Sequence, residues 1–352
     1  MKLYIAGGVG EHGRSCFFVE GTCATFIVDC GIMDGSETPY PHLTDAQIQA
    51  AKFLLITHSH IDHTGAFHWL VERGFSDCVI MTRETAVQLP LSPDCVCLID
   101  EMAPALSDIE LLDGFSVQWG RSGQCAGSVW YIIRQCGMTM LFSGDYVEDT
   151  LVYCCEPLRN VHAETAILDS AYGEAEETAN DYREIILNRV KNLMEQGKRI
   201  LFPVPKYGRG LELLLLLHNH FPRAVVSLDR HLENELSRID AYKEWIKPES
   251  FHMLQEIRCS INANKEPSVF LFLSDPQLKS PAGRALAAEI LAANDAVLIT
   301  GYADAGSYSE ELLASKCAEF SRYAVHMSHA ERKRLESLNA FSETIPYHCG
   351  DE

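Results

Sequence analysis

Short runs of apolar residues, separated by turn residues, dominate the first half of the chain. Each run has the length of a strand, and several end at Gly or Asp. The pattern predicts strands at 3–6, 16–19, 25–28, 53–56, 78–81, 129–133, 138–142 and 165–168. This half is therefore expected to be rich in β-sheet.

The pattern changes after Glu174, where an acidic stretch precedes a helical periodicity. Apolar positions between 181 and 197 recur at helical spacing, and a second apolar helix is expected at 210–218. Strand runs follow at 199–204, 224–228, 268–273 and 296–300, interleaved with helical segments. Because β/α alternation favours a parallel sheet, we expect a separate unit over 178–308, with 1–177 and 309–352 forming its host.

Composition places the chain among globular proteins and limits its partners. It has 352 residues, 47% hydrophobic and 22% charged, with a formal net charge of -20. A surface this acidic repels polyanions, so a nucleic-acid site would have to be a local basic or metal-centred patch. The apolar runs are too short to span a membrane, and no membrane partner is expected.

The cysteines indicate a reducing compartment. There are 13 of them, mostly single, and they include no C-x-x-C pair. We therefore expect reduced thiols and a cytoplasmic protein.

The clearest chemical signal is a dense group of potential metal ligands at His58, His60, Asp62 and His63. They directly follow the predicted strand 53–56, and such a loop is held rigidly with one side open. Imidazole and carboxylate suit zinc and similar divalent ions. The alternative, a polar turn with incidental histidines, fits such a density poorly.

With this motif the chain resembles the metallo-β-lactamase superfamily, whose H-x-H-x-D-H signature it reproduces. Further segments resemble the β-CASP branch, which includes ribonuclease J and the pre-mRNA 3′-end cleavage endonuclease. They are 10–16, 28–31, 142–145, 168–173, 203–212, 300–302, 327–330 and 346–350. The resemblance implies an α/β fold: a four-layer αβ/βα sandwich over 1–177 and 309–352, with a β-CASP cassette over 178–308.

The resemblance also implies roles for individual residues. His58 and His60 would bind a first metal, Asp62, His63 and His348 a second, and Asp145 would bridge the two. Two zinc ions held in this way activate water and clamp phosphoryl oxygens. Asp62 would also offset the charge of the cations, while Asp169 and His329 would support proton transfer. A helix-capping role is the alternative for His329.

One position departs from the family pattern. Gln124 stands where the family presents a histidine as the third ligand of the first metal. An amide oxygen is a poorer zinc ligand than imidazole, so we expect the first site to bind zinc more weakly, to hold another ion such as manganese, or to be empty. The chain would then hold one or two zinc ions. Cys125 and His12 are the alternative donors.

Four basic residues of the cassette are candidate phosphate contacts: Lys206 and Arg209, with Lys279 and Arg284 further along. Ordinary surface charge is the alternative for each. The resemblance favours a metal-dependent phosphodiesterase acting on RNA or single-stranded nucleic acid. A hydrolase of a small phosphorylated molecule or short oligonucleotide, and a catalytically impaired scaffold subunit, stay open, as does a homo-oligomer.

Overall fold

The structure, a computed structural model, describes residues 1–90, 95–261 and 267–350. The chain forms two compact units. The first unit comprises Met1–Glu148, Cys155–Glu176 and His326–Glu352, and the second comprises Asp149–Cys154 and Glu177–Val325. The first unit is thus assembled from segments on both sides of the second in sequence.

The units differ from the expected boundaries in two places: residues 149–154, expected in the host, belong to the second unit, and the return to the first unit comes later than expected. The second unit begins its long segment at Glu177, beside the expected start at 178, but the chain returns to the first unit at His326 and not at 309. The reason is strand pairing. Strand β17 (Glu319–Phe320) pairs in parallel with β16 (Ala296–Ile299) and so extends the sheet of the second unit.

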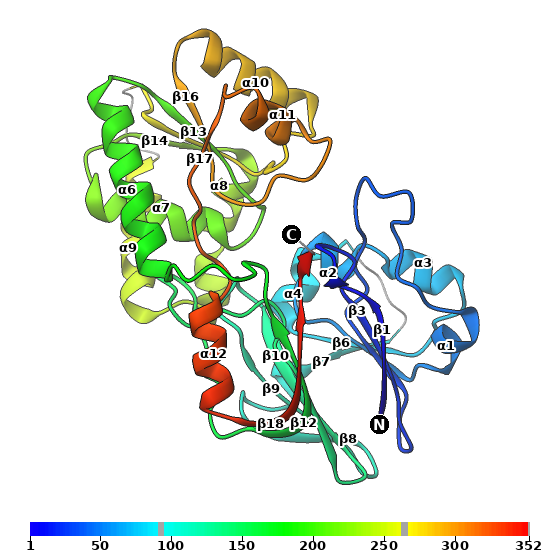
Figure 1. The fold of residues 1–352 in the computed structure, drawn as a ribbon. Coiled ribbons are helices and arrows are strands. Elements are labelled where there is room, and N and C mark those ends of the chain that lie inside the picture. Colours follow the sequence, from blue (N-terminus) through cyan, green and yellow to red (C-terminus); the bar gives the residue numbers. More distant parts are fainter. Residues whose placement is uncertain (91–94, 262–266, 351–352) are drawn as a thin grey trace. The chain divides into compact units, whose positions relative to one another are not determined.

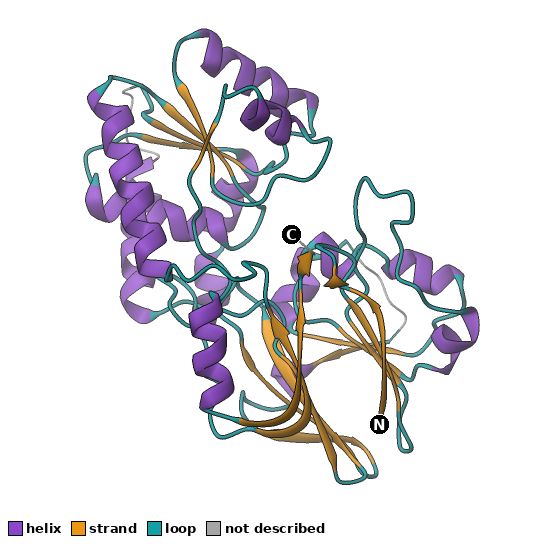
Figure 2. Cartoon of the chain, viewed as in Figure 1, coloured by secondary structure: helices purple, strands orange, loops and turns teal. Residues whose placement is uncertain are grey.

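The first unit contains two large sheets (Figures 1 and 2). The first sheet has the order β1 (Lys2–Gly7), β3 (Cys16–Glu20), β4 (Phe26–Val28), β5 (Phe53–Leu55), β6 (Cys78–Met81), β7 (Val96–Leu98). The second has the order β18 (Ala340–Tyr347), β12 (His162–Asp169), β11 (Met138–Phe142), β10 (Val129–Gln135), β9 (Phe115–Arg121), β8 (Asp108–Leu112). A small ladder joins β2 (Val9–Gly10) to β19 (Cys349–Gly350).

Aromatic side chains fill the space between the two sheets. Phe26 of the first sheet packs against Phe115 and Phe142 of the second, with ring centroids 5.6 and 6.4 Å apart. Phe53 stacks on Phe115, and Phe17 meets Tyr347 edge-on. Ring packing of this kind contributes both buried area and preferred geometry.

Helices cover the outer face of each sheet in the first unit. They are α1 (Asp45–Ala50), α2 (Ile61–Thr64), α3 (Phe67–Glu72), α4 (Arg83–Gln88), α5 (Ile99–Met102) and α12 (His329–Ser337). Ile48 of α1 and Leu70 of α3 share a buried cluster with Leu54 of the first sheet. Leu335 of α12 packs with Trp130 of the second. The four-layer α/β sandwich expected from the resemblance is therefore confirmed.

The second unit is built around a parallel sheet with the order β14 (Val226–Leu228), β15 (Phe270–Leu273), β13 (Ile200–Pro203), β16, β17. Its helices are α6 (Ala179–Glu195), α7 (Arg209–His220), α8 (Arg230–Ser237), α9 (Pro248–Ile261), α10 (Pro281–Ala292) and α11 (Tyr308–Ala314), with a 3₁₀ turn at Ile239–Trp245. The expected β/α alternation is present. Thr178 starts α6 through a capping box, which explains why the helix begins just after the acidic stretch.

A buried carboxylate ties the segment 149–154 into the second unit. Glu212 of α7 accepts hydrogen bonds from the backbone amides of Leu151, Val152 and Tyr153, at 2.9, 2.7 and 3.3 Å. The Tyr323 hydroxyl donates a further bond of 2.8 Å. A carboxylate satisfied in this way can be buried without a cationic partner. Among the described residues, none of the helices is long and apolar enough to cross a membrane.

Candidate metal centre

The ligand-rich loop follows directly from the end of a buried strand. Strand β5 ends at Leu55, His58 follows in the loop, and helix α2 begins at Ile61 with His60 as its N-cap. Gly31 permits this helix to approach, because a Cβ at that position would lie 1.6 Å from the Asp62 carbonyl oxygen. The loop is therefore anchored by a backbone contact that only glycine allows.

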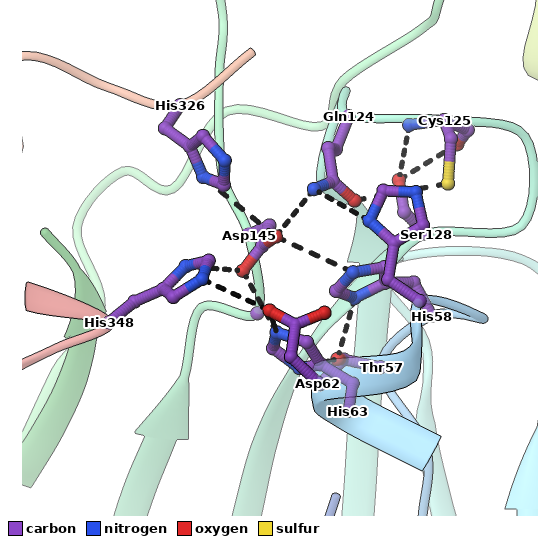
Figure 3. Close-up of polar contacts among 12 residues, drawn as sticks. Thr57, His58, Asp62, His63, Gln124, Cys125, Ser128, Asp145, His326 and His348 are labelled. Carbon is purple, nitrogen blue, oxygen red and sulfur yellow. Dashed lines mark hydrogen bonds and ion pairs between the residues drawn. The ribbon is translucent and has the colours of Figure 1, made fainter. Parts of the chain in front are cut away.

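Asp145 lies at the middle of the site, and its two carboxylate oxygens face different residues (Figure 3). Oδ1 lies 3.2 Å from His63 Nε2 and 3.3 Å from His348 Nδ1, and it accepts a 3.1 Å hydrogen bond from the Tyr347 hydroxyl. Oδ2 lies 3.4 Å from His58 Nε2. One carboxylate thus faces both of the ligand groups that the sequence predicts, which is the geometry of a bridging ligand.

The described residues form overlapping groups of potential ligands around Asp145. One group contains His58, His60 and Asp145, and a second contains Asp62, His63 and His348. A third group, Asp145, Asp169, His326 and His348, shares a residue with each of the other two. In the second group, Asp62 Oδ2 lies 3.1 Å from His348 Nε2. All six residues assigned to metal binding from the sequence therefore meet at one place.

Buried ring nitrogens without hydrogen-bond partners show that this group suits a cation. His58 Nε2, His63 Nε2 and both ring nitrogens of His348 are buried and make no hydrogen bond. Leaving such atoms unsatisfied costs about 1–3 kcal/mol each, so native structures rarely tolerate several together. Imidazole nitrogens and carboxylates are the donors that zinc and similar divalent ions prefer, so the donor set fits a metal.

The electrostatics of the group lead to the same conclusion. Burial opposes charge on His63 and His348, but the carboxylates beside them, Asp145 foremost, outweigh it and raise the pKa of both rings well above the usual value. Burial would raise the pKa of Asp62 and Asp145, yet neighbouring histidines hold both well below the usual value. The ionised carboxylates therefore attract positive charge, which protons or a metal would supply.

Asp29 positions His63 from behind. Its Oδ2 lies 2.8 Å from His63 Nδ1, and Thr57 donates to both of its oxygens, from the amide and from the hydroxyl. A carboxylate on the far nitrogen fixes the ring orientation and leaves Nε2 to face the metal position. The sequence placed Asp29 in a family-like segment but gave it no role. Its place directly after a strand, two residues before Gly31, was the available signal.

Gln124 lies where the resemblance expects a ligand histidine. Its side chain is buried, and its amide nitrogen donates a 2.5 Å hydrogen bond to Asp145 Oδ2 and lies 3.4 Å from His60 Nδ1. The amide therefore occupies the expected ligand position without adding an imidazole to the group. The expectation of a weaker first position rests on this geometry.

The two alternative donors do not join the described ligand groups. The Cys125 thiol is buried and lies 3.9 Å from the Gln124 amide oxygen. His12 stacks on His348 with ring centroids 4.3 Å apart, and its Nδ1 lies 3.1 Å from the His348 carbonyl oxygen. Burial, together with the nearby His348, lowers the pKa of His12 to about 4. His12 thus packs against a ligand as a neutral ring.

A histidine that the sequence analysis did not single out lies beside Asp169. His326 is buried, its Nδ1 lies 2.8 Å from Asp169 Oδ2, and Asp145 Oδ2 is 3.8 Å away. Asp169 is itself held by amide hydrogen bonds from Tyr146 and Ala171. Because His326 precedes α12 in an irregular segment, no periodic pattern marked it.

His329, to which the resemblance gave the proton-transfer role, lies elsewhere. It is the first residue of α12, after the N-cap Ser328. Its Nδ1 lies 3.3 Å from Glu174 and 3.1 Å from an Arg332 nitrogen, and it belongs to none of the described ligand groups. The geometry therefore favours the helix-start alternative for His329, and His326 is the histidine in contact with Asp169.

The candidate phosphate residues lie in the second unit. Lys206 is exposed in the loop between β13 and α7, and Arg209 is the first residue of α7. The Arg209 guanidinium packs on Gly301, where a Cβ would come within 1.8 Å of it. The other two candidates bind residues of the same unit: Lys279 forms an ion pair with Asp304 at 3.1 Å, and Arg284 donates a hydrogen bond to the Leu278 carbonyl.

Comparisons with known proteins agree with this site. Residues 9–86 match the family described as the metallo-beta-lactamase superfamily. The chain is 25% identical over 251 residues to the endoribonuclease ysh1 of Aspergillus fumigatus, a match covering 63% of this chain and 29% of that protein. It is 24% identical over 257 residues to a ribonuclease of Thermus thermophilus, covering 65% and 58%.

A solved structure extends the comparison to the whole fold. A protein of unknown function from Enterococcus faecalis aligns with a TM-score of 0.60 at 12% identity, over 98% of this chain and 93% of that one. The match between the sequences is shorter: it spans about three tenths of the fungal relative and less than two thirds of the bacterial one. The family match over residues 9–86, the layered fold and the ligand group agree with one another: the chain resembles the metallo-β-lactamase superfamily and the ribonucleases of its β-CASP branch.

Proposed function

We propose that the chain is a metal-dependent phosphodiesterase that hydrolyses RNA. The observation that carries the proposal is Asp145, whose oxygens each face a different group of buried histidines. The matched relatives, named as ribonucleases, support RNA as the substrate. The net charge of -20 favours short contacts with nucleic acid over long tracking along it.

The proposed ligands are His58 and His60 for a first ion and Asp62, His63 and His348 for a second, with Asp145 between them. Bound divalent ions would supply the charge that activates water and stabilises the phosphoryl oxygens. Zinc is the proposed ion because imidazole dominates the donor set. Gln124 makes manganese the alternative in the first position, since an amide oxygen is a harder donor.

We propose the following roles for the other residues of the site. Asp29 keeps His63 oriented, and Asp62 offsets the positive charge of the centre. Asp169 holds His326 through Nδ1, which leaves His326 Nε2 as the ring nitrogen to pass a proton to the leaving oxygen. We assign this role to His326 in place of His329. Lys206 and Arg209 are proposed to contact substrate phosphates. The chain's reduced cysteines favour a cytoplasmic location.

A cleavage assay with metal analysis tests the proposal. End-labelled single-stranded RNA, DNA of the same sequence and a generic phosphodiester are incubated with the wild type, with Asp145→Ala, with His63→Ala and with His68→Ala. His68 is an exposed histidine of α3 and serves as the control. We expect RNA cleavage by the wild type and the control, and loss of both cleavage and bound metal in the two site variants.

The other possible results of this assay would each support a different function. Activity on the small phosphodiester but not on RNA would support a hydrolase of small phosphorylated molecules. Metal binding without any cleavage would support a non-catalytic subunit, with Gln124 as its cause. Cleavage that survives Asp145→Ala would show that the metal centre is not the active site.

A further inference from the structure

Three thiols come together at the edge of the first sheet. Cys78 is the first residue of β6. Cys97 lies in the next strand, β7, and Cys95 directly precedes that strand. The register pairs Ile80 with Cys97, and the Val79 amide donates to the Cys95 carbonyl. Side chains alternate along a strand, so Cys95 and Cys97 project from one face, and Cys78 projects from the same face of β6.

The distances between the sulfur atoms are short. Cys78 Sγ lies 2.8 Å from Cys97 Sγ, and all three Sγ atoms lie within 4.8 Å of one another. The three cysteines are free thiols. A tetrahedral zinc site with zinc–sulfur bonds of about 2.3 Å places its sulfurs about 3.8 Å apart. The observed group needs only small side-chain rotations to reach that spacing.

We propose that Cys78, Cys95 and Cys97 form a separate site for a thiophilic divalent cation of the zinc class. Three thiolates supply the soft donors that such an ion prefers over carboxylate or carbonyl oxygen. Cys95 is exposed, so the ion can enter from solvent and complete its coordination with water.

The position of this site separates it from the catalytic centre. Cys78 pairs with Phe53, at the beginning of β5, whereas His58 follows the end of that strand. The two sites therefore lie at opposite ends of the parallel strands of the first sheet. Strand β7 is the terminal strand in the described order of that sheet. An ion bound by residues in and next to β6 and β7 would stabilise the pairing of these two strands. The role is structural.

Binding must displace protons from the thiols. A thiol must lose its proton to bind a cation as a thiolate. The cation would replace those protons and release them to solvent. Uptake therefore weakens as the pH falls and is accompanied by acidification of a weakly buffered solution.

Titration of the full-length, reduced protein with cadmium chloride tests the proposal. Cadmium bound by thiolate gives a sulfur-to-metal charge-transfer band in the ultraviolet, which histidine and carboxylate ligands do not give. We expect one equivalent per chain to develop this band, with proton release, and zinc added in large excess to compete with cadmium for the site. Cys95→Ser and Cys97→Ser should each reduce the band and weaken binding at least tenfold.

The controls keep the test decisive. Cys136→Ser alters a second close thiol pair, Cys136 with Cys23 at 3.1 Å, which belongs to no ligand group among the described residues, and it should leave the band unchanged. Cys95 is exposed, so its replacement leaves the core intact even if the other variants fold poorly. A band that survives Cys95→Ser and Cys97→Ser, or a Cys78–Cys97 disulfide that forms in place of metal uptake, would overturn the proposal. His63→Ala should retain the band, which separates this site from the proposed nuclease centre.

Discussion

His326 Nδ1 lies 2.8 Å from Asp169 Oδ2, although the two residues are 157 positions apart in the chain. A carboxylate on one ring nitrogen fixes the orientation of a histidine. The adjacent Asp145 connects this pair to the ligand group. The pair therefore places a proton carrier beside the proposed metals.

His326→Gln tests the role of this pair. The variant keeps a polar side chain but cannot exchange a proton, so kcat on RNA should fall by about 10²–10⁴-fold. Metal content, measured by elemental analysis, should stay at the wild-type value. His329→Gln is the matched control and should change kcat little. A larger loss in His329→Gln than in His326→Gln would return the role to His329.

Gln124→His should add a strong ligand beside Asp145 and His60. Imidazole binds zinc better than an amide does, so zinc stoichiometry should rise from fewer than two ions per chain toward two. If both ions act on the phosphoryl group, RNA turnover rises as well. Two tightly bound zinc ions in the wild type would contradict the weakened first position.

Asp29→Asn should loosen the metal without removing a ligand. The amide cannot hold His63 Nδ1 as a charged oxygen does, so affinity for the second ion should fall by about 10–100-fold. Competition with a chromogenic chelator measures this constant. Asp113→Asn, a change in the β8–β9 turn, is the control. Unchanged affinity in Asp29→Asn would show that Thr57 and packing alone orient the ring.

Glu212→Ala should destabilise the second unit. Three backbone amides and the Tyr323 hydroxyl would lose their acceptor inside the core, which costs on the order of 3–5 kcal/mol. Urea unfolding followed by fluorescence measures the change. Glu195→Ala, at the exposed end of α6, should lie within about 0.5 kcal/mol of the wild type.

The pair Glu148 and Arg159 predicts a specific acid dependence. Burial would raise the pKa of Glu148, but hydrogen bonds from Arg159 and Tyr146 outweigh it and lower the pKa below its usual 4.5. A lowered carboxyl pKa stabilises the fold above pH 4.5, and this contribution is lost as the pH falls through the folded-state pKa.

Glu148→Gln should therefore be less stable than the wild type at neutral pH, by less than about 1 kcal/mol because both side chains are a third exposed. The gap should shrink below pH 4.5, as followed by thermal unfolding. Glu72→Gln, on exposed α3, is the control. A gap independent of pH would mean that shape rather than charge matters at Glu148.

The strands that the sequence predicted are those with continuous apolar runs, such as β6 and β11. Strand β18 was missed because most of its residues are exposed and it lacks an apolar run, and it is placed by parallel pairing with β12. Strand β8 was missed for a similar reason, since it carries acidic and exposed positions. Strand β9 was missed because its buried residues alternate with polar ones and form no continuous apolar run.

Some residues of the candidate site could be predicted from the sequence and others could not. The ligand group from His58 to His63 could be predicted because its members lie within six consecutive positions, so their spacing in the sequence identifies them. The contacts of His326 and Asp29 depend on segments distant in sequence, so no local pattern contained them. The register that gathers Cys78 with Cys95 and Cys97 is likewise a property of the folded sheet.

The division of the first unit into separated segments governs when the protein can become active during synthesis. His58 is made early, but β18 and His348, which directly follows it, are made only after the whole second unit. A nascent chain therefore holds the first histidines without the ligand that completes the second group. In the proposed nuclease, the second ligand group is therefore complete only after the segment that follows β18 has been made.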